Sequence, residues 1–331
     1  MVPVASVVES LYWSIARLDI RRPANLSASD VKNLRVTVNT TTDHPGEAES
    51  SSMTDTEAAS SSSEWRDYGK FLLKLALFVF ILRSFIVSPF NIPSESMQPR
   101  LLIGDYLLVA KWPYGFSNYS MPFSLPLIPG RIFANQPEAG DVVVFKAPKT
   151  DGVDYIKRAI GLPGDVIQMR NGALEINGVA VKRERIADLV IPVTQNMKDT
   201  AVLENTPFAC WQPDFEEPSK DGGTQCRYRR FVETLPNGRS YQILDIDDGM
   251  PGDDTEAFVV GEDEIFLMGD NRDRSADSRF PADGKAIGIV PQSNLVGRAL
   301  ISVFSTDGSA RWLLPWTWFT AMRPERIGQT F

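Results

Sequence analysis

The hydrophobic residues of this chain fall into one long run followed by many short ones. The long run, residues 68–90, reads YGKFLLKLALFVFILRSFIVSPF, and Lys74 and Arg83 are the only charges in its apolar part. Roughly 20 apolar residues in a helix cross a bilayer. The pattern therefore predicts one transmembrane anchor helix over residues 68–90, although Arg83 is a costly residue inside a membrane.

A buried core helix and a cleavable leader are two other interpretations of this run. Leader cleavage requires small residues three positions and one position before the cut. The nearest such stretch, residues 86–88, begins with the bulky Ile86 and is followed by Pro89. We therefore expect an uncleaved anchor.

Positive charges flank the run on one side. Arg66, Lys70 and Lys74 lie at its start, whereas the next Lys or Arg after Arg83 is Arg100. Cytoplasmic flanks of membrane helices carry the excess of Lys and Arg. We therefore expect the N-terminus in the cytoplasm and the rest of the chain after the anchor on the other side of the membrane.

Residues 1–67 form a tail that has little to bury. From Asn39 to Glu64 the residues Ser, Thr, Asp and Glu dominate, which is a composition typical of disorder. We expect a disordered cytoplasmic tail over residues 1–67, with Met53 as an alternative start of the chain.

After residue 90 the pattern changes to short apolar runs. DYLLVAKW, DVVVFKAP, DYIKRAIGL, EIFLMGD and NLVGRALISVF are rich in β-branched and aromatic residues and are separated by Gly, Pro, Asn and Asp. NGALEINGVAV has the turn spacing of a β-hairpin. These runs predict a mainly β domain over residues 91–331, built from curved antiparallel sheets or a partly open barrel, with loop-rich insertions over residues 182–260.

Composition and charge narrow the chemistry. With a net charge of −8 and a pI of about 4.9, the chain offers no basic surface for nucleic acid. Its single histidine, His44, lies in the polar tail, so catalysis by histidine and a histidine-ligated zinc site are excluded. Cys210 and Cys226 are too few for a cysteine-only metal site; we interpret them as a disulfide, with two free thiols as the alternative. No metal or cofactor is expected.

Two hydroxyl groups follow the long apolar run directly. The stretch NIPSESMQPR places Ser94 and Ser96 one residue apart, although serine beside proline is also common turn chemistry. Without histidine, a nucleophilic serine needs a carboxylate or a neutral lysine as its base. Lys157 in DYIKRAIGLPGD has apolar neighbours that would keep it dry, but the pattern alone does not choose it over Lys111 or Lys146.

Four boxes of sequence carry a resemblance to a known family. IPSESMQPRLLIGDYLLVAK, GDVVVFKAP, DYIKRAIGLPGD and GDNRDRSADSR follow the predicted anchor in this order. They resemble the successive conserved boxes of bacterial type I signal peptidase, the leader peptidase, and the resemblance covers the chain from Phe71 to Arg298. It implies a serine endopeptidase of the bacterial inner membrane, with a periplasmic or extracytoplasmic catalytic domain. Such an enzyme removes signal peptides from exported preproteins after small-x-small motifs.

The resemblance also implies roles for individual residues. Ser96 matches the nucleophile and Lys157 the general base of a Ser-Lys dyad that works through an acyl-enzyme. Ser94 matches the hydroxyl of the oxyanion hole, and Ser275 matches the residue that orients the lysine amine. Asp277 and Arg279 match a supporting ion pair of the family. The apolar residues that bind substrate in the family are matched by Phe90, Ile92, Pro93, Met97, Leu101, Val144, Tyr155 and Ile156.

Three residues depart from the pattern of the family. Glu95 stands where glycine is usual, Arg100 replaces a threonine, and Arg274 replaces an asparagine. We expect no positive φ at Glu95, whose side chain would then face solvent or substrate. All predicted catalytic groups remain in place.

The late segment RWLLPWTWF, residues 311–319, concentrates three of the seven tryptophans of the chain. Buried aromatic packing is one interpretation. The other is a surface that rests among lipid headgroups, where indole rings are favoured.

Two other functional classes share parts of this pattern. LexA-like autoproteases use a Ser-Lys pair but join it to a DNA-binding domain and have no anchor, and a membrane-tethered β scaffold would bind without cutting. The presence of both Ser96 and Lys157 favours the enzyme. The expected partners are preprotein signal peptides and the lipid bilayer, and we expect a monomer that binds no nucleic acid.

Overall fold

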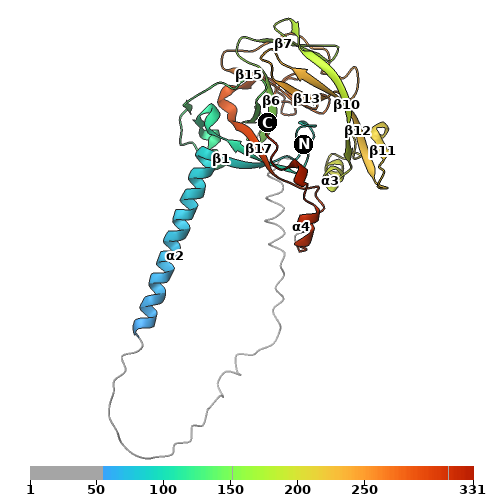
Figure 1. Cartoon of the computed structure of the whole chain (residues 1–331). Coiled ribbons are helices and arrows are strands. Elements are labelled where there is room, and N and C mark those ends of the chain that lie inside the picture. Colours follow the sequence, from blue (N-terminus) through green and yellow to red (C-terminus); the bar gives the residue numbers. More distant parts are fainter. Residues whose placement is uncertain (1–54, 151, 312) are drawn as a thin grey trace, which may run out of the picture. The chain divides into compact units, whose positions relative to one another are not determined.

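A computed structural model describes residues 55–150, 152–311 and 313–331 (Figure 1). Residues 78–331 pack into one compact unit, and residues 55–77 belong to a second. The predicted tail up to residue 54, including the alternative start at Met53, lies outside the described residues.

The first helix differs at both ends from the predicted anchor over residues 68–90. Helix α2 spans Asp55–Ile81, a π-helical turn covers Leu82–Ile86, and strand β1 begins at Val87. Pro89 explains the early end, because proline lacks the N–H that a helix requires and is tolerated in an edge strand such as β1. The expectation of disorder was wrong for residues 55–67, where alanine and glutamate are good helix formers. Among the described residues, no helix is both long enough and apolar enough to span a membrane.

The largest sheet has seven strands in the order β1-β2-β17-β5-β6-β15-β16, each antiparallel to its neighbours. These strands are β1 (Val87–Asn91), β2 (Asp105–Ala110), β17 (Leu295–Ser305), β5 (Val142–Lys146), β6 (Asp154–Gly161), β15 (Glu264–Met268) and β16 (Val290–Pro291). Register shifts interrupt the pairing of β17 with β2 and β5 and of β15 with β6. Because such bulges bend a sheet, it curls into a half-barrel, as the predicted curved fold requires.

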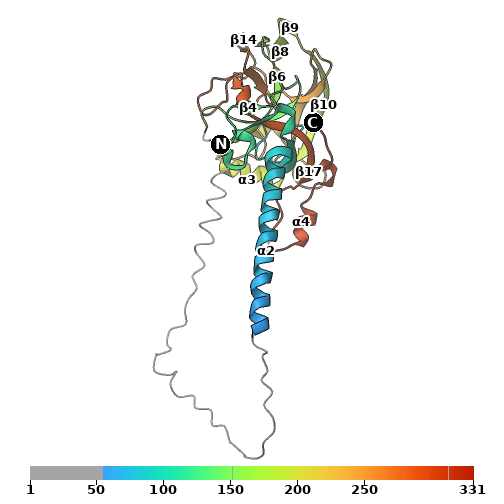
Figure 2. The same ribbon diagram turned by 90° about the vertical axis from the view of Figure 1, so that its left-hand side faces the viewer.

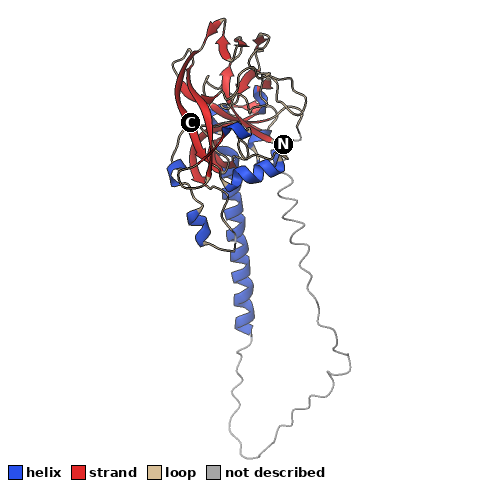
Figure 3. Ribbon diagram, turned by 90° about the vertical axis from the view of Figure 1, so that its right-hand side faces the viewer, coloured by secondary structure: helices blue, strands red, loops and turns tan. Residues whose placement is uncertain are grey.

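Smaller sheets and short helices complete the β-rich unit. A second sheet contains β10 (Lys182–Pro192), β12 (Thr224–Thr234), β11 (Glu216–Pro218) and β13 (Ser240–Leu244); a third contains β14 (Phe258–Val259), β7 (Val166–Arg170), β8 (Ala173–Ile176) and β9 (Val179–Ala180); and β3 (Phe116–Ser117) pairs with β4 (Arg131–Ile132). The helices are α3 (Gln195–Leu203), α4 (Trp316–Thr320) and the 3-10 turns Trp112–Tyr114, Asn118–Ser120, Pro122–Ser124, Pro213–Phe215, Gln292–Asn294 and Pro324–Arg326. Strands dominate this unit (Figure 3).

Both faces of the large sheet are buried. Along β15, Phe266 and Met268 belong to one hydrophobic cluster, whereas Ile265 and Leu267 belong to another. Successive side chains of a strand point to opposite faces. Neighbouring residues on the central strands are therefore buried on opposite sides of the sheet.

The predicted hairpin is present as β7, β8 and β9. Its turns are Asn171-Gly172 and Asn177-Gly178, and all four residues have positive φ between 49° and 76°. Asn-Gly is the preferred pair for such two-residue turns. Figure 2 shows β8, β9 and β14 gathered at one end of the unit.

The segment over residues 182–260 is more regular than the predicted loop-rich insertion. Strands β10 and β12 each have 11 residues, and α3 packs against them through Met197. The many charged residues of β10, KRERIADLVIP, made it hard to recognise as a strand from the sequence. A strand with one exposed face needs few apolar residues.

Cys210 and Cys226 form a disulfide with a Cα–Cα distance of 5.7 Å, which confirms the interpretation from the sequence. Both sulfur-bearing side chains are buried in the cluster that contains Met197 and Tyr228. The bond therefore ties the segment after α3 to β12.

The C-terminal aromatic segment is exposed, and buried packing was the wrong interpretation for its described residues. Leu313, Trp316, Trp318 and Phe319 are between 41% and 92% exposed on and beside α4. Too few neighbouring elements surround this short helix to cover its rings (Figure 1). Contact with lipid headgroups stays a prediction.

Candidate active site

Ser96 and Lys157 meet although 61 residues separate them along the chain. Lys157 lies on β6, and its Nζ is 2.6 Å from Ser96 Oγ, while the amine also donates a hydrogen bond to the Ile156 carbonyl at 3.1 Å. Both side chains are buried, with 3% of Lys157 and 7% of Ser96 exposed. The fold thus brings the two predicted catalytic groups into hydrogen-bond contact.

The amine of Lys157 lies in a dry environment. Burial lowers the pKa of Lys157 to about 8, against the carboxylates of Asp277 and Asp270, which raise it. Each of these carboxylates forms its ion pair with an arginine and not with Lys157: Asp270 pairs with Arg158, and Asp277 pairs with Arg279. A lysine with such a pKa is partly neutral near pH 7 to 8 and can accept a proton.

The two other lysines that the sequence left open are differently placed. Lys146 forms an ion pair of 3.0 Å with Asp154. Lys111 is buried and its pKa is lowered to about 8 by burial, but its Nζ lies 5.5 Å from the ring centre of Phe90. Among the three lysines, only Lys157 contacts Ser96.

Backbone hydrogen bonds hold residues 94–97, the serine segment, in place. The N–H of Asn271 donates to the carbonyl of Ser96 at 3.1 Å, and the N–H of Leu101 donates to that of Met97 at 2.9 Å. Ser94 is exposed, and its Oγ lies 3.4 Å from Ser96 Oγ. Ser94 therefore lies close to the predicted nucleophile, as its predicted role in an oxyanion hole requires.

Gly269 is a site residue that the sequence analysis missed. A Cβ atom at this position would lie 2.3 Å from Ser275 Oγ and 2.5 Å from the carbonyl oxygen of Ser96. Only glycine therefore fits between these two residues. The available signal was its place at the head of GDNRDRSADSR, one of the four boxes that carry the resemblance.

Ser275 is 5% exposed, and among the described residues its Oγ makes no hydrogen bond to the amine of Lys157. It packs against Gly269 instead. The predicted hydrogen bond from Ser275 to the lysine amine is thus not formed in this state, and the orienting role of Ser275 stays a prediction.

Substitution of Gly269 by alanine is expected to lower kcat/KM by about a hundredfold, because a shift of roughly 1 Å at the nucleophile has that effect. The added methyl group must displace Ser96 or Ser275. Steady-state cleavage of a preprotein measures the loss. Gly223→Ala is the matched control, since nothing lies within 4 Å of its Cβ position, and equal activity of the two variants would contradict the assignment.

The predicted ion pair of Asp277 and Arg279 is present and fully buried. Arg279 donates to Asp277 at 2.9 and 3.0 Å, and the N–H of Gly269 donates to the same carboxylate at 2.9 Å. Burial by itself would raise the pKa of Asp277, but Arg279 outweighs it and keeps the pKa below its usual value. The pair therefore fixes the loop that carries Gly269 and Ser275.

The eight predicted substrate-binding residues divide into two groups. Ile92, Met97, Leu101 and Val144 are at most 3% exposed and belong to the core, so they do not form an open surface. The other four residues are at least partly exposed and are the ones that a peptide can contact first, namely Phe90, Pro93, Tyr155 and Ile156. Ile156 packs against both clusters that contain the buried four.

Two departures from the family pattern pair with each other. Glu95 is 8% exposed, so the expectation that it faces solvent was wrong, while contact with substrate stays a prediction. Arg274 lies 3.3 Å from Glu95 and 2.8 Å from Glu204. Burial raises the pKa of Glu95, and Arg274 opposes this rise. Glu95 has no positive φ, as expected. The triad links the serine segment to Glu204 at the end of α3.

Three carboxylates outside the dyad lie close together. Oxygens of Asp245, Asp253 and Asp273 lie within 4.8 Å of one another. Asp245 pairs with Arg183, and Asp273 accepts backbone N–H bonds from Ile246 and Asp247 at 2.6 and 3.0 Å. These partners explain the cluster of carboxylates as part of the hydrogen bonding that closes the loops.

Comparison with known proteins places these residues in a family context. The profile of the family described as "Signal peptidase, peptidase S26" matches residues 65–304. A signal peptidase I of Rickettsia prowazekii is 35% identical over 249 residues, covering 73% of this chain and 80% of the relative. A signal peptidase I of Rickettsia conorii is 37% identical over 251 residues, covering 73% and 79%. A solved signal peptidase I from Enterococcus faecalis has 24% identity and a TM-score of 0.24, covering 50% of this chain and 97% of that one.

Proposed function

Because the chain belongs to the signal peptidase family, peptidase S26, we propose that it cuts its substrates with Ser96 as nucleophile and Lys157 as general base. Its activity is that of signal peptidase I, the cleavage of signal peptides from preproteins. The observation that carries the residue assignment is the 2.6 Å contact between the hydroxyl and a buried amine.

The reaction is acyl transfer in two halves. Neutral Lys157 takes the proton of Ser96 as Oγ attacks the scissile carbonyl, and the backbone N–H of Ser96 with the Ser94 hydroxyl stabilises the oxyanion. The protonated amine then gives its proton to the leaving amine, so the mature chain departs and the signal peptide remains as an ester on Ser96. A water molecule, deprotonated by Lys157, hydrolyses this ester and restores both groups.

The substrate is proposed to bind as an extended strand. Strand β1 is an edge of the seven-stranded sheet and leads directly into the serine segment. A peptide added at an edge presents alternate side chains to the protein. Shallow contacts with Phe90, Tyr155 and Ile156 would suit small side chains at alternate positions, which supports cleavage after small-x-small motifs.

The chain is further proposed to be anchored in the bacterial inner membrane as a monomer, with its N-terminus in the cytoplasm and its catalytic domain outside. Along α2, Phe71, Leu73, Leu77 and Phe78 are between 56% and 70% exposed, a surface that suits lipid better than water. The disulfide supports an oxidising compartment for the catalytic domain.

The test is to incubate the purified full chain in detergent with a preprotein and to map the cut by mass spectrometry. One cut after a small residue, with a second small residue two positions earlier, is the expected result. Cleavage at unrelated positions, or none by a correctly folded chain, would contradict the proposal.

The pH dependence of cleavage follows from the pKa of Lys157. Only the neutral amine is a base, and with a pKa of about 8 the neutral fraction is about one tenth at pH 7 and about one hundredth at pH 6. We expect kcat/KM to rise about tenfold from pH 6 to 7 and about fivefold from pH 7 to 8, and then to level off. A flat profile over this range, or a rise that continues to pH 10, would contradict a dry lysine as base, provided that circular dichroism shows the same fold throughout.

A further inference from the structure

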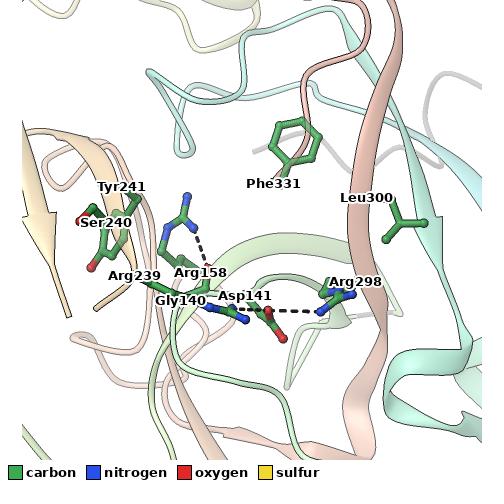
Figure 4. A pocket seen from close by; sticks show the side chains of 9 residues that line it. All are labelled: Gly140, Asp141, Arg158, Arg239, Ser240, Tyr241, Arg298, Leu300 and Phe331. Carbon is green, nitrogen blue, oxygen red and sulfur yellow. Dashed lines mark hydrogen bonds and ion pairs between the residues drawn. The ribbon is translucent and has the colours of Figure 1, made fainter. Parts of the chain in front are cut away.

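A cavity of about 300 Å³ opens in the β-rich unit. Arg158 lines it, and because Arg158 follows Lys157 on β6, the two side chains point to opposite faces of the sheet. Figure 4 shows Leu300 and Phe331 on one side of the cavity and Tyr241 on the other. This volume is at the lower end of the range of about 300 to 1,000 Å³ that small-molecule sites occupy.

The cavity is rich in guanidinium groups, although the chain as a whole has a net charge of −8. Three arginines and one aspartate line it, namely Arg158, Arg239, Arg298 and Asp141. Arg158 binds Asp270 through two hydrogen bonds of 2.7 and 2.6 Å, and Arg239 binds Asp141 at 2.7 Å. Two of the three guanidinium groups are therefore neutralised.

The third group, Arg298, is paired less closely. Asp141 already accepts hydrogen bonds from Tyr114 at 2.9 Å, from the N–H of Glu138 at 3.1 Å and from Arg239. Arg298 forms an ion pair with the same carboxylate at 3.7 Å, which is longer than a hydrogen bond, and its side chain is 37% exposed. Its donors thus remain available at the cavity wall.

A further arginine adds to the positive potential. Arg100, one of the departures from the family pattern, lies 5.3 Å from the ring centre of Phe331, which lines the cavity. Burial and the neighbouring charges of Arg158 and Arg326 lower the pKa of Arg100. Cations that repel one another in a partly closed space attract an anion.

We propose that this cavity binds a small organic anion, a phosphate or carboxylate group carried on an apolar moiety, with Arg298 as the residue that pairs with the anion. The planar guanidinium of Arg298 presents parallel donors that match both anions. Leu300 and Phe331 supply the apolar contacts. The cavity and the dyad are served by different side chains, because Arg158 and Lys157 are neighbours on β6 and point to opposite faces of the sheet.

The test is isothermal titration of the purified full chain in detergent with phenyl phosphate, benzoate, inorganic phosphate and phenol. We expect phenyl phosphate or benzoate to bind at least about tenfold more tightly than inorganic phosphate or phenol. Only the first two carry both an anion for Arg298 and an apolar ring for Leu300 and Phe331. Arg298→Gln, and independently Leu300→Glu, are expected to weaken that binding about tenfold or more. Thermal melting establishes that each variant is folded.

Arg170→Gln is the matched control, because it removes one positive charge from an exposed arginine on β7 and should bind as the unaltered chain does. The proposal is overturned if neither aromatic anion binds, if inorganic phosphate binds as tightly, or if both cavity variants bind normally. Equal weakening by the control would overturn it too, since attraction to the overall charge would then explain binding.

Discussion

Replacing Lys157 by methionine is expected to abolish cleavage of a preprotein while the chain remains folded. Methionine keeps the length of the side chain and its apolar stem, and the position is buried, so packing on β6 is preserved. What is lost is the amine 2.6 Å from Ser96 Oγ. Without a base the hydroxyl remains protonated, and we expect kcat to fall on the order of 10⁴-fold or more.

The measurement is single-turnover cleavage with excess enzyme, together with a thermal melt of each variant. Lys146→Met is the matched control, because Lys146 is the partly exposed lysine that the sequence also allowed as a base, and it should retain most of its activity. Retained cleavage by a folded Lys157→Met variant would refute the base. Loss in the Lys146 variant alone would transfer the role to Lys146.

The sequence predicted the parts of the fold that short-range patterns encode. The Asn-Gly turns at 171–172 and 177–178 were readable because they depend on the φ angles that those two residue types tolerate. The boundary near Pro89 was misplaced because hydrophobicity continues through it, whereas the backbone changes from helix to an edge strand paired with β2. Apolar content alone does not distinguish these states.

The sequence predicted the residues of the candidate dyad but not the ion pairs that surround them. Ser96 and Lys157 were found from motifs, yet the pairing of Glu95 with Arg274 spans 179 residues and depends on how the sheets close. The same holds for Arg158 with Asp270, which are 112 residues apart. Sequence patterns constrain neighbours within a few positions, while such ion pairs are set by the tertiary fold.

Breaking the buried pair of Glu233 and Arg272 is expected to give the largest loss of stability in the chain. Glu233 accepts two hydrogen bonds from Arg272, one of them at 2.7 Å, and one from Tyr241 at 2.9 Å. The two charged side chains are only 1% and 2% exposed. Glu233→Ala leaves the guanidinium buried and unpaired, which costs about 3 to 5 kcal/mol.

Urea unfolding of the β-rich unit, followed by tryptophan fluorescence, measures this loss, and the double variant Glu233→Met with Arg272→Met separates charge from packing. Because it removes both charges, we expect it to be more stable than either single variant. Glu217→Ala is the control, since its pair with Arg227 at 2.7 Å is exposed and screened by water, and it should leave the midpoint almost unchanged. If Glu233→Ala shifted the midpoint no more than Glu217→Ala, the pair would not hold β12 to the loop after β15. Some other interaction would then have to hold in place the loop in which Asn271 donates a hydrogen bond to the Ser96 carbonyl.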